Sequence, residues 1–298
     1  MDYQALLSDV LDANHHKGGL KCRRLFRVEG EFFNRLRQEI LALVEAQKPS
    51  RVAEKTHITN WTNPYGDALQ YSLFNRSGSF NDTSADHDRS LEGKKFHHAD
   101  TYPTIDEFIK AFPHAYNMRL NGMGPKGGLS PHEEHIVWPS PQQSSPRTFL
   151  MRGRFHLPIV TNDKVEMLLD EEIFHFEVGS IFFFNNGCIH SANNGGSEFR
   201  YHLVWDMFLT EQTLDLMFNE TASPPVPFLE TVVGDDRTVP ATRQIDVKEY
   251  AIQGEGEKLY RQWQLQRLGI APHTFHNWFN EWTYWRHSRL GKVDLVRL

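Results

Sequence analysis

Cysteine is scarce in this chain, with only Cys22 and Cys188 among 298 residues. Disulfide bonds therefore do not build the fold, and a reducing, cytoplasmic compartment is the simple expectation. Long hydrophobic runs are also missing, because no apolar stretch approaches the roughly 20 residues that a transmembrane helix needs. The polar start, Met1-Asp2-Tyr3-Gln4, lacks the character of a secretory signal peptide. We expect a protein that does not associate with membranes.

Basic residues are in the minority, since 38 Asp and Glu residues exceed 32 Lys and Arg residues and give a net charge of −6. This balance argues against a chain built wholly for binding nucleic acid. No repeat of 20–50 residues occurs, which excludes solenoids and propellers. Histidine, in contrast, is plentiful, at 16 residues. The abundance of histidine raises the question of which of these side chains form a metal site.

The clearest helical pattern lies near the N-terminus. Residues 31–47 carry apolar side chains at helical spacing, so Phe32, Leu36, Ile40 and Leu43 fall on one face. This pattern predicts an amphipathic helix that buries these four residues.

The other parts outside the central region give weaker signals. Thr104, followed by Glu107, predicts a helix start with a reciprocal cap. Residues 50–100 are polar and predict loops with short strands, and residues 222–245 predict a linker or surface loop. Residues 255–285 return to a helical pattern.

The central region, from about residue 115 to 210, has the character of short strands separated by turns. Residues 148–160 alternate, with Phe155 on one side and Arg154 and His156 on the other. Helices at the spacing of βαβ units are absent, so a parallel α/β sheet is not expected. The region predicts a β-sandwich or barrel.

A candidate metal site lies inside this region. In an extended segment the side chains at positions i and i+2 point the same way, so His132 and Glu134 can face one metal ion. His190, which follows the predicted strand 180–185, is the candidate third ligand. Two histidines and one carboxylate form the facial triad of non-haem Fe(II) oxygenases, which leaves one coordination face open for a cosubstrate and O₂.

Basic side chains accompany these ligands on neighbouring strands. Arg200 comes ten residues after His190, across an Asn-Gly-Gly turn, where a guanidinium is suited to clamp a carboxylate. Arg154 and His156, two residues apart, add further donors on the same side of their strand. Arg152 shares that face and is a candidate for contacting the substrate.

The motifs His132-x-Glu134, Arg154-x-His156, His190 and Arg200 together resemble the aspartyl/asparaginyl β-hydroxylase family. Members of this family are Fe(II)- and 2-oxoglutarate-dependent oxygenases, and the family includes relatives that act on free proline. The resemblance covers about a third of the chain.

The resemblance implies a role for each matching residue. His132 and His190 would bind iron, and Arg200 would pair with the distal carboxylate of 2-oxoglutarate. Arg154 and His156 would contact the cosubstrate near the metal.

Two positions depart from the family pattern. The third ligand position, which holds Asp in some members and Gly with a water in others, holds Glu134, one methylene longer than Asp. A carboxylate at this position favours hydroxylation over halogenation. The hydroxyl donor expected on the preceding strand is replaced by Asn121, the nearest polar candidate.

From these features we predict a mainly β protein with flanking helices (α+β). Its core is a double-stranded β-helix, a jelly roll of the cupin-like type, over residues 115–212. Residues 1–114 form a helical and loop region packed on this core, and residues 213–298 form a linker and a C-terminal helical extension. The function predicted is that of an Fe(II)/2-oxoglutarate-dependent dioxygenase that uses O₂ and hydroxylates an amino acid or a peptide residue, with release of succinate and CO₂.

Competing interpretations exist for the iron site and for the function. His98-x-Asp100 is a rival ligand pair, and His135 is a rival to Glu134. The same iron site is also compatible with desaturation, cyclisation or cleavage of a specialised metabolite. A metal-binding jelly roll without turnover, or a regulator that binds DNA through its C-terminal helices, is a further alternative.

Other motifs favour structural roles. The glycine pattern at residues 122–127 has no helix after it and predicts a turn rather than a dinucleotide site. Residues 267–282 outline a helix-turn-helix, but their aromatic side chains at helical spacing indicate packing, which argues against DNA binding. Cys188 is predicted to be a small buried hydrophobe, and Trp205 and Asp206 to be core and turn residues.

Overall fold

The computed structural model describes residues 1–14, 18–47, 68–82, 84, 88–129, 134, 136–139, 149–188 and 190–244. The predicted C-terminal helices at 255–285 and the outline at 267–282 lie outside these residues. The helical elements are α1 (Tyr3–Asn14), α2 (Gly30–Ala46), α3 (Pro103–Lys110), α4 (Glu211–Phe218) and the short 3₁₀ helix η2 (Gly234–Arg237). The strands are β1 (Cys22–Val28), β2 (Ala68–Ser72), β3 (Ala115–Met123), β4 (Val137–Pro139), β5 (Phe149–Val160), β6 (Val165–Leu169), β7 (Glu172–Phe174), β8 (Ser180–Phe184), β9 (His190–Asn194), β10 (Arg200–Phe208), β11 (Leu229–Thr231) and β12 (Arg243–Gln244).

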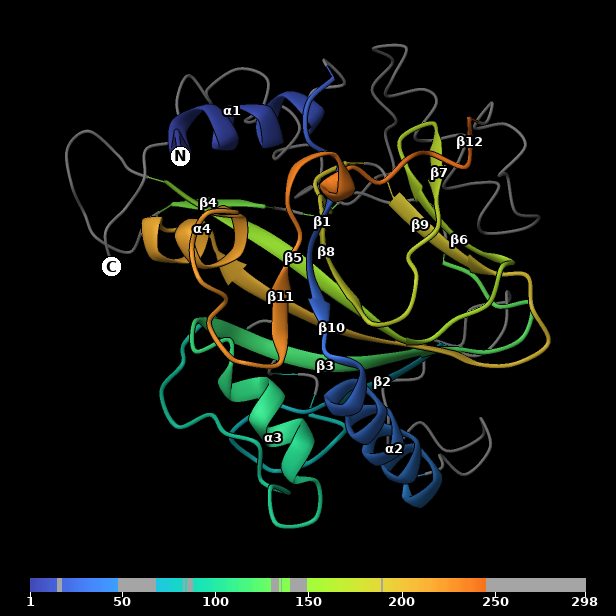
Figure 1. Ribbon diagram of the computed structural model, residues 1–298. Coiled ribbons are helices and arrows are strands. Elements are labelled where there is room, and N and C mark those ends of the chain that lie inside the picture. The colour runs from blue at the N-terminus through green and yellow to red at the C-terminus, as the bar shows by residue number, and fades with distance from the viewer. Residues whose placement is uncertain are drawn as a thin grey trace, which may run out of the picture.

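The strands form two antiparallel sheets (Figure 1). The larger sheet has the order β11-β1-β8-β5-β10-β3-β2, with β4 paired to β5, and the smaller sheet has the order β12-β7-β6-β9. The chain crosses between the sheets repeatedly, so most neighbours within the larger sheet are distant in sequence, whereas β6 and β7 of the smaller sheet are consecutive. This arrangement confirms the predicted jelly roll with flanking helices. Strands β1, β2, β11 and β12 join the sheets from outside the range 115–212.

The two faces of the larger sheet differ because side chains alternate along each strand. On β10, Leu203, Trp205 and Met207 belong to the main hydrophobic core, together with residues of α1, α2, α3 and α4. Trp205 is fully buried, as predicted, and its ring packs 4.7 Å from that of Phe112, just after α3. The opposite face of the same strands carries buried polar side chains and looks toward the smaller sheet. We call this opposite face the inner face.

The amphipathic helix predicted at 31–47 is confirmed as α2, with Phe32, Leu36, Ile40 and Leu43 buried. The predicted cap at Thr104 is wrong. Thr104 lies inside α3, and the side chain of Tyr102, the residue before this helix, makes no capping hydrogen bond.

A residue of α2 takes the place of the predicted cap. The Glu39 carboxylate accepts the backbone N–H groups of Thr104 (3.0 Å) and Ile105 (2.9 Å) and the Thr104 hydroxyl (2.6 Å). The α3 terminus is therefore satisfied by a contact 65 residues away in sequence, which a local pattern does not reveal.

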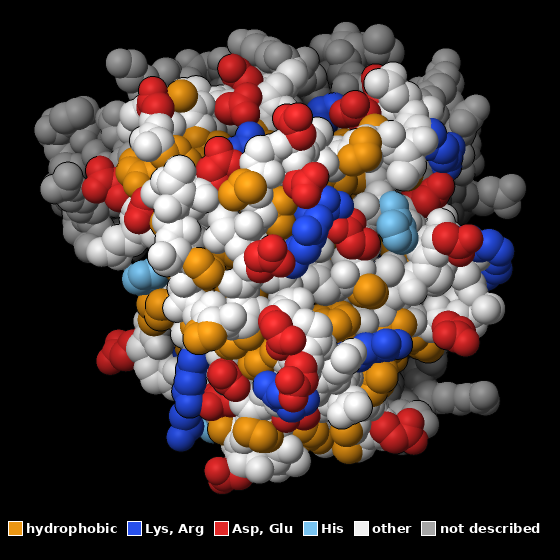
Figure 2. Space-filling model, viewed as in Figure 1, with side chains coloured by type: hydrophobic (Ala, Val, Ile, Leu, Met, Phe, Trp, Pro, Cys, Tyr) orange, Lys and Arg blue, Asp and Glu red, His pale blue; other side chains and the backbone are white. Residues whose placement is uncertain are grey.

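The segment 222–245, predicted as a linker or surface loop, contains β11, η2 and β12 instead. On the face shown in Figure 2, acidic and basic side chains of the described residues are interspersed. None of the described helices combines the length and the apolar character needed to cross a bilayer.

Candidate active site

The inner face is built as a ladder by the pairing of β10 with its two neighbours. His202 pairs with Asn121 of β3 and with Pro158 of β5. Two residues further along β10, Val204 pairs with Arg119 and His156.

The next step of the ladder pairs Asp206 with Asn117 and Arg154. Because paired residues point to the same face, polar side chains from three strands gather in one layer. The alternation predicted for residues 148–160 is confirmed, since Phe155 lies in the outer core while Arg154 and His156 lie on the inner face.

Glu134 is the first predicted ligand that the structure places, and its carboxylate is held by arginines. Arg154 donates Nη1 to Oε1 at 2.5 Å and Nη2 to Oε2 at 2.9 Å. Arg152 donates Nη2 to Oε2 at 2.7 Å, and Asn186 donates Nδ2 to the same oxygen at 3.2 Å. The backbone N–H of Glu134 also donates to the Asn186 carbonyl at 2.9 Å. These contacts hold one carboxylate oxygen, Oε2, on three donors.

The other carboxylate oxygen of Glu134 faces His190. His190 Nε2 lies 3.7 Å from Glu134 Oε1, and His190 is 5% exposed. His190 Nδ1 lies 2.9 Å from the carbonyl oxygen of Cys188. Since a carbonyl only accepts, Nδ1 carries the proton, and in the neutral ring the lone pair is on Nε2.

These donors fit a divalent metal ion. Bonds from a metal to a histidine nitrogen or a carboxylate oxygen are about 2.0–2.2 Å, so one ion is able to touch both atoms across the 3.7 Å gap. A ligating histidine that donates its second N–H to a backbone carbonyl is the usual arrangement in metal sites. Within the described ranges, no three His, Cys, Asp or Glu side chains form a group able to hold a metal ion. His132 and His135 lie outside these ranges, so the structure brings together two of the three predicted ligands.

Asp206 is the second carboxylate that contacts these arginines. The fully buried Asp206 carboxylate accepts from Arg154 Nε at 2.8 Å and Nη2 at 3.1 Å, and from Asn117 Nδ2 at 3.0 Å. Arg119 and Arg152 lie 3.7 and 3.9 Å away. Burial acts to raise the pKa of Asp206, but the three arginines hold this pKa well below its usual value.

The same cluster acts on the arginines. Burial acts to lower the pKa of Arg154, but Asp206 and Glu134 raise it well above its usual value. Both edges of the Arg154 guanidinium are therefore occupied by carboxylates. Any contact of Arg154 with a cosubstrate requires a shift of Glu134.

His156 and Arg200, two further predicted site residues, are buried on the inner face, at 6% and 4% exposure. Arg200 pairs with Met123 across the sheet, and its Nη2 lies 4.0 Å from the Met123 sulfur. The His156 ring packs 4.8 Å from Phe184, whose ring lies 5.3 Å from that of His190. Phe184 therefore connects His156 and His190.

The remaining predicted residues have clear positions. Asn121 lies on β3 opposite His202, and its side-chain oxygen is buried without a hydrogen-bond partner among the described residues. Cys188 is buried, as predicted, and it also orients His190 through its carbonyl. The rival His98 donates its Nε2–H to the Gly78 carbonyl and stacks on Phe80, in a loop region of the chain.

Sequence reasoning missed four inner residues that the pairing brings to the site. Asp206 is a buried strand residue rather than a turn residue, which corrects the prediction. The four residues are Asn117, Asn186, His202 and Asp206. A signal for His202 and Asp206 was available in the sequence. Both lie at even-numbered positions of the strand that contains Arg200, so their side chains share the face of Arg200.

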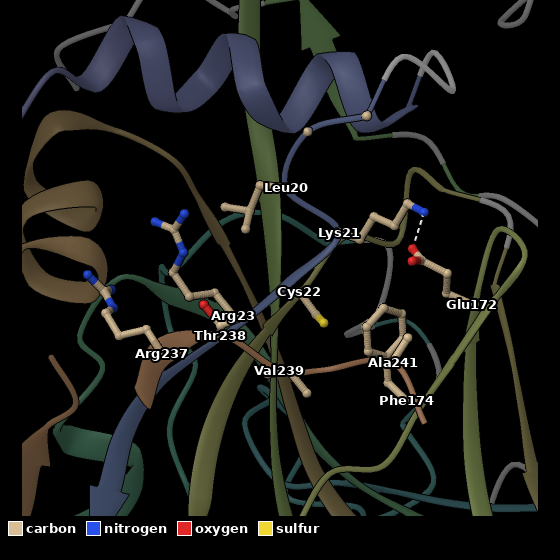
Figure 3. A pocket seen from close by; sticks show the side chains of 12 residues that line it. Leu20, Lys21, Cys22, Arg23, Glu172, Phe174, Arg237, Thr238, Val239 and Ala241 are labelled. Carbon is tan, nitrogen blue, oxygen red and sulfur yellow. Dashed lines mark hydrogen bonds and ion pairs between the residues drawn. The ribbon is translucent and has the colours of Figure 1, made fainter. Parts of the chain in front are cut away.

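A separate pocket of about 420 Å³ lies at the edge of the barrel, between the start of β1, β7 and the segment after η2 (Figure 3). Cys22, Phe174, Val239 and Ala241 form its apolar part, and Lys21 and Glu172 form an ion pair beside them. Glu134, His156, His190 and Arg200 are not among its lining residues.

Comparison with known families identifies the class of this fold and site. The family model described as aspartyl/asparaginyl β-hydroxylase matches residues 31–209, more than half of the chain. The chain therefore belongs to the aspartyl/asparaginyl β-hydroxylase family. This membership supports an oxidoreductase of the Fe(II)/2-oxoglutarate oxygenase superfamily.

Solved structures that this chain matches include an oxidoreductase of the 2OG-Fe(II) oxygenase family from Burkholderia pseudomallei. It has 11% identity and a TM-score of 0.33, and the alignment covers 59% of this chain and 89% of that one. A prolyl-4-hydroxylase from Pseudomonas putida has 9% identity and a TM-score of 0.34, with 68% and 97% covered. AviO1 from Streptomyces viridochromogenes has 11% identity and a TM-score of 0.38, with 74% and 98% covered. No curated protein matches the chain. The membership of this chain in the aspartyl/asparaginyl β-hydroxylase family is shown by the match over residues 31–209.

Proposed function

We propose that this chain is an Fe(II)- and 2-oxoglutarate-dependent dioxygenase that hydroxylates an unactivated C–H bond of an amino acid or a peptide residue. One observation carries the proposal: in a chain of this family, His190 Nε2 and Glu134 Oε1 face each other at 3.7 Å beside a buried layer of arginines. Two ligands on one side of an ion, completed by a third, leave room for a cosubstrate.

Three residues would hold the metal: His190, Glu134 and His132. With Fe(II), 2-oxoglutarate and O₂ bound, the site would supply the oxidising chemistry, with succinate and CO₂ as coproducts. The Cys188 carbonyl keeps the His190 lone pair directed at the metal position. Arg154, Arg152 and Asn186 fix the orientation of the Glu134 carboxylate.

Arg200 would bind the distal carboxylate of 2-oxoglutarate. Its side chain is buried on the inner face, and a buried guanidinium binds a carboxylate more strongly than one in water does. His156 would add a contact near the metal. Asn121, on the neighbouring strand, would supply a further polar contact to the cosubstrate.

Arg152 is our candidate for contacting the substrate, which we propose to be a small molecule or a peptide. Its side chain is 11% exposed, and that of Glu134 beside it is 27% exposed, so this is the more open end of the cluster. A substrate carboxylate would find a guanidinium there.

The function is tested by incubating purified protein with Fe(II), ascorbate and 2-oxoglutarate and measuring succinate. We expect slow succinate release without substrate and at least about a tenfold loss in Arg200→Ala, since a buried charge-assisted contact is removed. Arg35→Ala gives a matched control, because the Arg35 side chain is 51% exposed on α2. Unchanged turnover in Arg200→Ala would reject the cosubstrate role. Product analysis by mass spectrometry with candidate substrates then separates hydroxylation from desaturation, cyclisation or cleavage.

The metal ligands are tested by calorimetric titration with Mn(II), which does not support turnover. We expect His190→Gln and Glu134→Gln to bind Mn(II) at least about tenfold more weakly than the native chain, because each loses one bond to the ion. Native affinity in both variants would reject the site.

A further inference from the structure

Among the residues that the structure describes, two histidines of the inner face have no hydrogen-bond partner for any of their ring nitrogens. Nδ1 and Nε2 of both His156 and His202 are buried, and none of these four atoms is paired among the described residues. The rings lie 5.8 Å apart and almost perpendicular. His202 is 0% exposed, so water does not satisfy it from outside. Buried polar side chains are hydrogen-bonded in most proteins, so two adjacent exceptions call for a ligand or a function.

Both rings are held in the neutral form. Burial is the largest cause that lowers the pKa of His202 well below its usual value, and the charge of Arg200 adds to this effect. Burial and the charges of Arg154 and Arg200 do the same to the pKa of His156. A neutral imidazole keeps one N–H donor and one acceptor.

The strand geometry places His202 next to Arg200. Both residues point to the inner face from alternate positions of β10, about 7 Å apart along the strand. Across the sheet, His202 pairs with Asn121, whose side-chain oxygen is also buried and has no partner in the described part of the chain. Arg200, His202, Asn121 and His156 thus form one patch that contains several unsatisfied polar atoms.

We propose that His202 is a binding residue for 2-oxoglutarate. Its ring N–H donates to the distal carboxylate, the same carboxylate that pairs with Arg200. This inference rests on the proposed function. A dicarboxylate on Arg200 brings acceptor oxygens to the layer in which the unpartnered ring nitrogens lie. The neutral His202 N–H then completes the hydrogen bonding of the carboxylate without adding a buried charge.

The substitution that separates ligand binding from packing is His202→Phe. Phenylalanine fills a similar volume and removes both ring nitrogens. If His202 serves only to fill space, removal of two unsatisfied polar atoms preserves or raises the unfolding temperature and leaves ligand affinity unchanged. His202→Asn is the second variant, because its amide retains an N–H donor. His98→Phe is the matched control, since His98 stacks on Phe80 outside the inner face.

The experiment measures 2-oxoglutarate binding by calorimetry in Mn(II)-loaded protein, together with Mn(II) affinity and the unfolding temperature. We expect about a tenfold to hundredfold weaker 2-oxoglutarate affinity in His202→Phe, with native Mn(II) affinity. His202→Asn should recover part of this loss, and His98→Phe should bind 2-oxoglutarate as the native chain does.

The outcomes separate the two proposals. Native 2-oxoglutarate affinity in a folded His202→Phe overturns the role of His202 and leaves the proposed function intact. If His202→Phe fails to fold, His202→Leu and His202→Asn are compared instead, because they have similar volumes and only Asn has an N–H donor. Tighter 2-oxoglutarate binding by His202→Asn supports the N–H role, and equal affinities of the two folded variants overturn it. Absence of any 2-oxoglutarate binding in the Mn(II)-loaded native chain overturns the proposed function itself.

Discussion

Asp206→Asn is the substitution that tests the buried charge cluster most directly. Asp206 is fully buried, and Arg154, Arg119 and Arg152 all lie within 3.9 Å of its carboxylate. Asparagine has nearly the same shape, so the packing is preserved while the negative charge is removed. The substitution leaves Glu134, at the more open end of the cluster, as the remaining carboxylate that contacts Arg152 and Arg154.

The size of the effect follows from the contacts that are lost. Asp206 accepts two hydrogen bonds from Arg154, at 2.8 and 3.1 Å, and one from Asn117 at 3.0 Å. An amide offers one acceptor oxygen in place of two and turns an NH₂ group toward arginine donors. Breaking a buried ion pair by removing one partner costs about 3–5 kcal/mol. Because the whole free energy of unfolding of a domain is about 5–15 kcal/mol, the loss is a large fraction of it.

The assay is urea unfolding at neutral pH, followed by circular dichroism. Asp236→Asn is the matched control, because Asp236 is 69% exposed and pairs with Arg27 at 3.5 Å on the surface, where such pairs contribute about 0–1 kcal/mol. The double variant Asp206→Asn, Arg119→Met should recover part of the stability, since one uncompensated buried charge is removed. A loss in Asp206→Asn below about 1 kcal/mol, or equal to that of Asp236→Asn, would refute this account.

Two further predictions concern a helix terminus and pH. Glu39→Ala should lower the free energy of unfolding by about 1–2 kcal/mol, because three donors at the start of α3, including two from Thr104, lose their acceptor; an unchanged thermal midpoint would contradict this. His156 and His202 have depressed folded-state pKa values, so the unfolded chain takes up protons first as pH falls below about 6.5, and stability should decline from there downward. Urea unfolding at pH 7 and pH 5.5 checks this, and the variant with both histidines replaced by Phe should lose less stability over that interval.

The parts of the fold that follow local periodicity could be predicted from the sequence. The alternation of Phe155 against Arg154 and His156 predicted both faces of β5, because side chains of a strand alternate whatever the strand pairs with. The face of α2 was equally predictable from its helical spacing. In contrast, Thr104 fulfilled a local capping rule and still lies inside α3, because Glu39 on another helix offers a charged acceptor for the same donors.

The chemistry of the site was only partly predictable, for the same physical reason. The types of the ligands and arginines were visible in the motifs, but the partner of Arg154 was not. Asp206 lies 52 residues from Arg154 in sequence, and the contact depends on the register of β5 against β10. Register depends on the turns and on which face of each strand the core buries, so a shift of one residue would have turned Asp206 toward the outer core.

Glu134 shows why the longer side chain matters at the third ligand position. Its backbone N–H donates to the Asn186 carbonyl, both oxygens of its carboxylate accept from Arg154, and Oε1 also faces His190. The same carboxylate is thus both the counter-ion of two buried arginines and a ligand candidate. Since a metal ion withdraws negative charge from its ligand, a metal ion bound at Oε1 would weaken the hold of Glu134 on the arginines. The affinity of the arginine pair for a second carboxylate, such as that of a substrate, should therefore rise when the metal is bound, which links the order of binding to the geometry of one side chain.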